Sequence, residues 1–141
     1  MANTTATIWE TPFTFSPFPS VGLVMEPDGD DSALLVIAPG GLDAYPKYLV
    51  RFTKVFAASC GKEAGFVLDL GQEKSSKNVV AHIWHASPQA AAYSDTVFGA
   101  DLEIRHYVVF GGDNIASIIS GELPIIETIN KPDELVIRHA V

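Results

Sequence analysis

The chain has 141 residues, the size of one domain that buries its core without disulfides or metals, so we expect a single domain over 1–141. Its net charge is −8 and its nine Lys and Arg residues form no basic cluster, which disfavours nucleic acids and anionic membranes as partners. A single cysteine excludes an intramolecular disulfide and fits a reducing compartment.

The N-terminal segment combines a short strand with an arm rich in Phe and Pro. We predict a strand over 5–10 and an irregular arm at about 10–20, because proline has no N–H for a sheet ladder. The aromatic rings of Phe13, Phe15 and Phe18 need a dry environment, either on the domain's own core or on a neighbouring chain. The start of the chain has no secretory signal, and no apolar run is long enough to span a membrane, so we expect a soluble, cytoplasmic protein.

A turn-rich stretch, "PDGDDS", lies between two apolar segments. Pro, Asp and Gly each favour turns, so we predict a hairpin over 21–38. Its second strand, "ALLVIA", is apolar throughout, which is typical of a central strand buried on both faces.

Residues 43–60 show the spacing of an amphipathic helix. Apolar side chains recur there at steps of three and four. Asp43 fits an N-cap and Gly61 fits a C-cap, so the segment has both helix ends. We predict one long helix that covers one face of a sheet.

The second half of the chain contains short helices between strands. We predict a helix capped by Ser87, with Pro88 at its first position, and another over 114–120 closed by Gly121. The order of elements predicts an α+β fold: a mixed, mostly antiparallel sheet with the long helix on one face and one or two short helices. Further strands are expected at 65–70, 79–85, 100–110, 125–129 and 134–141.

Three of the four histidines share a strand face with large apolar side chains, as strand alternation shows; they are His82, His106 and His139. If their strands are neighbours, the imidazoles meet in a pocket and can hold a metal or move protons; otherwise each is half-buried and bonded to backbone. His85 is three residues from His82 and points to the opposite strand face. Because metal motifs usually offer a close pair on one face, we expect no metal site.

The candidate site residues come from these strand faces. Asp69 lies in an apolar strand, where it is either a buried general base with a raised pKa or a solvent-facing carboxylate. The ligand-binding candidates are Trp84, Tyr107 and Phe110. The catalytic candidates are His82, His106, His139, Asp69 and Tyr107.

Two hypotheses about function follow from composition. Charged residues make up only 18% of the chain, so either a second subunit covers apolar surface or the surface is rich in small polar residues. The leading hypothesis is a small self-associating domain, with a homodimer favoured, that binds a small ligand or a protein partner. The alternative is a small enzyme with a histidine-centred pocket for proton transfer or hydrolysis. Neither hypothesis requires a cofactor, and none is expected.

Overall fold

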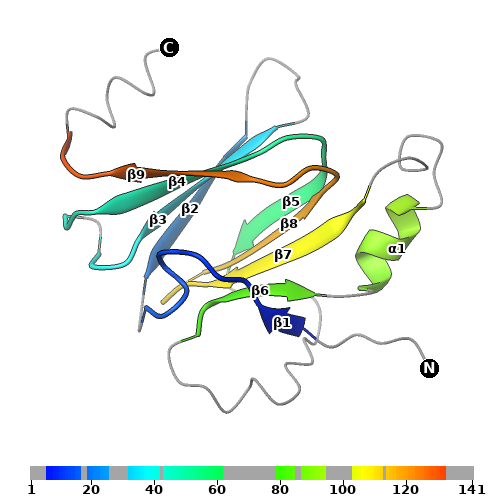
Figure 1. Cartoon of the computed structure of the whole chain (residues 1–141), viewed down its shortest axis with the longest axis horizontal. Helices are drawn as coiled ribbons and strands as arrows, with labels where there is room; N and C mark the ends of the chain where they lie inside the picture. The colour runs from blue at the N-terminus through cyan, green and yellow to red at the C-terminus, as the bar shows by residue number, and fades with distance from the viewer. Residues whose placement is uncertain are drawn as a thin grey trace.

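The computed structural model describes residues 6–16, 19–25, 32–41, 43–61, 79–84, 87–94, 103–112 and 114–132 (Figure 1). Within these residues the chain is mainly β, with one short helix. The elements in chain order are β1 (Ala6–Ile8), β2 (Ser20–Met25), β3 (Ala33–Ala38), β4 (Lys47–Phe52), β5 (Val55–Gly61), β6 (Ala81–Trp84), α1 (Pro88–Ser94), β7 (Arg105–Phe110), β8 (Ile115–Ser120) and β9 (Ile125–Ile129).

The strands form two antiparallel sheets. One sheet has five strands in the order β1-β6-β7-β8-β5, and the other has four in the order β2-β3-β4-β9. Figure 1 shows α1 beside the five-stranded sheet, near the ends of β6 and β7. The hairpin over 21–38 is confirmed as the β2–β3 pair, and β3 is a buried strand between β2 and β4. The α+β prediction is wrong, because the described residues form mainly two antiparallel sheets and α1 is the one helix among the elements named above.

The long helix predicted over 43–60 is replaced by β4 and β5. Its apolar spacing also satisfies a period of two: Tyr48, Val50 and Phe52 face the core between the sheets. Tyr48, Val50, Phe52, Val55 and Phe56 are β-branched or aromatic residues, which favour a strand. Lys54 has a positive φ of 51°, which ends β4 and directs the chain into the other sheet.

The helix predicted over 114–120 is also wrong, since this segment is β8. Its isoleucines fit a strand with both faces packed: Ile118 enters the core between the sheets and Ile115 packs on the opposite face. The helix expected after Ser87 is confirmed as α1. Ser87 Oγ accepts the N–H of Ala90 at 3.0 Å, as an N-cap does. No helix in the described part of the chain is long and apolar enough to span a membrane.

The two sheets are joined at a corner, where two paired segments of the chain pass from one sheet into the other. β4 pairs with β9 in one sheet, and their continuations β5 and β8 pair in the other. The N–H of Gly121 donates to the carbonyl oxygen of Lys54 at 2.9 Å, so hydrogen bonding continues through the bend. The hydroxyl of Ser120 donates to the carbonyl oxygen of Thr53 at 2.7 Å. One bent two-stranded ribbon therefore belongs to both sheets.

The core between the sheets is rich in aromatic rings. Trp9 lies 4.8 Å from Tyr107 and 5.7 Å from Phe13, measured between ring centroids. Phe13 is fully buried, so this part of the N-terminal arm folds back onto its own domain. Phe15, two residues later, is 69% exposed. Phe18 lies outside the described residues.

Candidate functional site

The histidine-bearing face is the outer face of the five-stranded sheet. Trp84 of β6 lies opposite His106 of β7, and His82 lies opposite Val108, so these side chains share one face. Tyr107, with the other parity, enters the aromatic core between the sheets. Both His82 and His106 are 1% exposed. The outer face is therefore a second buried layer on the same sheet.

His106 is held between two serine hydroxyls. Its Nδ1 lies 2.7 Å from Ser87 Oγ at the start of α1, and its Nε2 lies 2.6 Å from Ser117 Oγ on β8. A neutral imidazole has one donor and one acceptor nitrogen, so one serine accepts a hydrogen bond and the other donates one. Burial lowers the pKa of His106 to about 4, which keeps the ring neutral at pH 7.

Aromatic rings surround these histidines. The ring of Trp84 lies 5.2 Å from that of His106, and Phe110 meets His82 edge-on at 5.5 Å. α1 is fixed over the sheet at a second point, where Tyr93 lies 5.4 Å from the Phe56 ring. These contacts form one largely buried cluster on β6, β7, β8 and the start of α1. We call it the His106 cluster: His82, Trp84, Ser87, His106, Phe110 and Ser117.

The structure brings together some of the residues selected from sequence and separates others. His82, Trp84, His106 and Phe110 share the outer face, whereas Tyr107 lies on the opposite one. The three ligand-binding candidates are therefore divided between two faces. Burial raises the pKa of the Tyr107 phenol, and the charge of Arg105 opposes the shift. Asp69 and His139 lie outside the described residues.

Sequence reasoning missed the two serines that contact His106. Ser87 was recognised as a helix cap, and its second contact required knowledge of where α1 packs. Ser117 was not recognised as a neighbour of His106, because its segment was predicted to be a helix over 114–120. Had that segment been assigned as a strand, alternation from Ile115 would have placed Ser117 on the histidine-bearing face.

No group of three or more His, Cys, Asp or Glu side chains suited to a metal ion occurs among the residues that the structure describes. The cluster around His106 instead offers hydroxyl and imidazole groups. Such groups can hold a helix in place or exchange protons.

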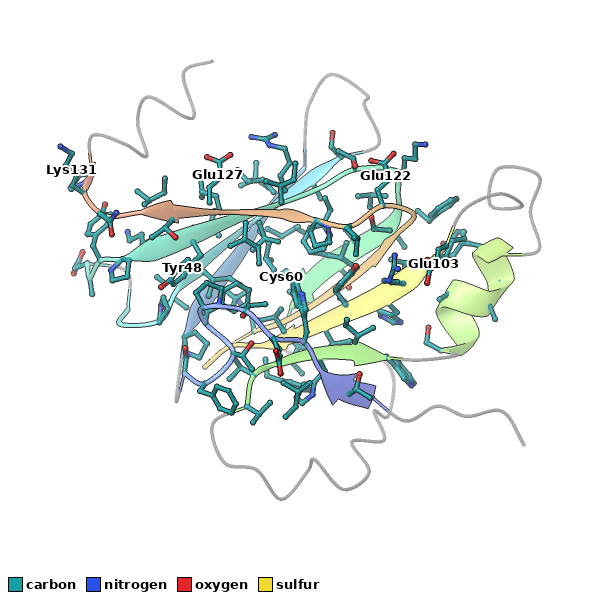
Figure 2. All side chains as sticks on the ribbon, viewed as in Figure 1. Tyr48, Cys60, Glu103, Glu122, Glu127 and Lys131 are labelled. Atoms are coloured by element: carbon teal, nitrogen blue, oxygen red, sulfur yellow. The ribbon has the colours of Figure 1, made fainter. Side chains whose placement is uncertain are left out.

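A second candidate site lies at the corner between the sheets. Leu123 is 67% exposed and Ile125, at the start of β9, is 62% exposed. Beside them, Lys54 Nζ and Glu122 Oε1 form an ion pair at 3.1 Å, and Thr53 Oγ1 donates to Glu122 Oε2 at 2.6 Å. Figure 2 shows Glu122 near the start of β9 at this corner, with Glu127 farther along the strand. We call Lys54, Glu122, Leu123 and Ile125 the corner patch.

Hydrogen bonds from Thr53 and Lys54 lower the pKa of Glu122. Glu122 is therefore ionised at neutral pH, and the patch contains one positive and one negative charge in contact. Apolar side chains and a balanced ion pair are both available to a partner at this corner.

Comparison with protein-family models, with curated proteins and with solved structures gives no match for this chain.

Proposed function

We propose that the protein is a non-catalytic binding module that self-associates. The observation that carries the proposal is the exposure of Leu123 and Ile125, two residues apart in the sequence. Full burial of a Leu or Ile side chain is worth about 1.5–3 kcal/mol, so a partner that covers both gains a substantial part of that energy. The low share of charged residues in the sequence, 18%, agrees with a surface of this kind.

The chemistry of the His106 cluster supports a non-catalytic role. Both ring nitrogens of His106 are engaged by serine hydroxyls, and the side chain is buried. With a pKa of about 4 the imidazole is a weak base at neutral pH. These properties suit a residue that fastens α1 to the five-stranded sheet.

Sedimentation equilibrium tests the proposal. We expect the weight-average mass of the full chain to rise with concentration between about 1 μM and about 1 mM, the range of weak to moderate protein association. A mass that stays at 15.1 kDa over that whole range would contradict the proposal.

The alternative function is hydrolysis at the His106 cluster. The favouring observation is the 2.6 Å contact between Ser117 Oγ and His106 Nε2, with Nδ1 oriented by Ser87. In that role the Ser117 proton passes to Nε2 while Oγ attacks an acyl carbon. Nε2 then gives the proton to the departing group, and water cleaves the acyl-serine to release the acid and restore Ser117. A fluorophosphonate probe would then label the wild type and spare Ser117→Ala. Equal labelling of both, or no labelling of either, would remove this alternative.

A further inference from the structure

We infer that His106 is a proton-operated latch, which holds α1 on the five-stranded sheet at neutral pH and releases this helix in acid. The ring joins two elements that are distant in sequence, because Nδ1 contacts Ser87 at the start of α1 and Nε2 contacts Ser117 on β8. Uptake of a proton changes the hydrogen bonding of both ring nitrogens. Self-association is not needed for this latch, so the latch is tested separately from the proposed function.

The hydrogen bonds of the ring fit the neutral imidazole. Neutral His106 donates to one serine and accepts from the other, whereas the protonated ring has two donors and no acceptor. The serine that donates to the neutral ring must therefore turn its hydroxyl away when the ring is protonated. Ser87 is fully buried, and its Oγ already accepts the N–H of Ala90 at 3.0 Å. Any change at this hydroxyl therefore also affects the cap of α1.

The described elements packed against His106 supply no carboxylate to this face of the sheet. The titratable residue on β6 is His82, the one on α1 is Tyr93, and the strands β1 and β8 have none. On β7 itself, Arg105 and Tyr107 have the opposite parity to His106. Desolvation of the charged form lowers the pKa of the imidazole to about 4, and contact with water removes this penalty.

Displacement of α1 is the easiest way for water to reach the ring. Within the sheet β7 lies between β6 and β8, and both are held to it by paired backbone. The helix has only seven residues, and it is attached through Ser87 at one end and through the contact between Tyr93 and Phe56 at the other. Its release disrupts less structure than the separation of two strands. Acid should therefore open α1 before it unfolds the sheets.

The opened form differs from the closed form at its surface. The Trp84 ring lies 5.2 Å from the His106 ring, and both side chains are buried while α1 is in place. Hydration of His106 therefore also brings water to the Trp84 ring. The latch thus makes an aromatic surface available in acid that the protein keeps covered at neutral pH.

Amide hydrogen exchange of the full chain, followed by NMR at pH 7 and pH 5, tests the latch. The N–H of Ala91 donates to the carbonyl oxygen of Ser87 at 3.0 Å and reports on α1. The N–H groups of β3, which is paired on both sides, report on global unfolding. The protection factor of Ala91 should lie at least about tenfold below those of β3 at both pH values, because α1 opens locally.

The acid dependence of this opening follows from the proton taken up by His106. The pKa of the ring is about 4 in the closed form and returns towards 6.5 when the ring is hydrated. The opening constant should therefore rise by up to about twentyfold from pH 7 to pH 5, and the protection factor of Ala91 should fall by the same factor. An Ala91 protection factor that does not fall over this range would overturn the latch.

Two matched variants assign the effect to one histidine. His106→Gln keeps hydrogen-bonding atoms at the position but does not titrate, so the protection factor of Ala91 should change by less than about twofold between pH 7 and pH 5. His82→Gln removes the other histidine on this face and should keep the full change of the wild type. A fall in protection that survives His106→Gln, or that disappears in His82→Gln, would show that His106 is not the latch.

Ser87→Asp tests the contact itself. Asp caps a helix as well as Ser does, and its carboxylate pairs with a protonated ring and raises the pKa of His106. The protection factor of Ala91 in this variant should therefore not fall between pH 7 and pH 5. A fall as large as in the wild type would overturn the inference.

The wild type alone decides the question if a variant does not fold, which thermal unfolding at pH 7 shows. Equal protection of Ala91 and β3 at pH 5 would mean that α1 opens only when the whole domain unfolds, and this result also overturns the latch.

Discussion

The burial of His106 predicts a specific loss of stability in acid. The unfolded histidine binds a proton below its ordinary pKa of 6.5, whereas the folded one binds it only near pH 4. Between these values the unfolded state holds more protons, so the free energy of unfolding falls as the pH falls. Linkage gives a loss of about 2 kcal/mol by pH 5 and about 3 kcal/mol by pH 4, as an upper limit.

The matched variant is His106→Gln, which keeps hydrogen-bonding atoms at the position but does not titrate in this range. Urea unfolding at a series of pH values, followed by tryptophan fluorescence, gives the free energy of unfolding of each protein. Trp9 and Trp84 are both largely buried, so their emission reports the loss of structure. Because other groups titrate equally in both proteins, the difference between them isolates the imidazole. If the difference stays constant from pH 7 to pH 4, the desolvation argument is wrong.

Three further predictions follow, of which two compare a pair of variants and one compares the folded with the unfolded protein. Ser117→Ala removes the hydroxyl that contacts the buried His106 imidazole, and it should lower the free energy of unfolding by about 1–2 kcal/mol. The control, Ser59→Ala, is at the exposed position opposite Ser117 on β5 and should change the free energy of unfolding by under about 0.5 kcal/mol. Equal effects of the two variants in urea unfolding would argue against the hydrogen bond. Phe13→Ala empties a core position and should cost about 3–5 kcal/mol, while Phe15→Ala should cost under about 0.5 kcal/mol; a stable Phe13→Ala protein would mean that the arm does not belong to the core. Burial raises the pKa of Cys60, so its thiol should react with a disulfide reagent at pH 8 more slowly in the folded protein than in urea; equal rates would contradict this.

The sequence predicted those elements whose signals are local. The hairpin over 21–38 was marked by its turn residues, and α1 by Ser87 and Pro88. The segment 43–60 failed because its apolar residues fit periods of both 3.6 and two, and only the partners of β4 and β5 decide between them. The pairing of β4 and β5 with strands distant in sequence therefore determines the structure of this segment, because its apolar pattern is ambiguous.

The candidate site was predictable only in part, for a related reason. Alternation along β6 and β7 placed His82 and His106 with apolar residues, and the register confirms that they share a face. Alternation cannot show which face of β7 meets the other sheet, because both faces are apolar and buried. It also cannot show which helix or strand supplies a hydrogen-bond partner, so Ser87 and Ser117 required the three-dimensional arrangement.

The bent ribbon has a mechanical consequence. Because β4 continues into β5 and β8 continues into β9, neither sheet can slide or detach without tearing the hydrogen bonds at the bend. The domain should thus lose both sheets in one cooperative transition rather than one after the other. A force applied at Leu123 is therefore transmitted to both sheets, and the bend resists local unfolding.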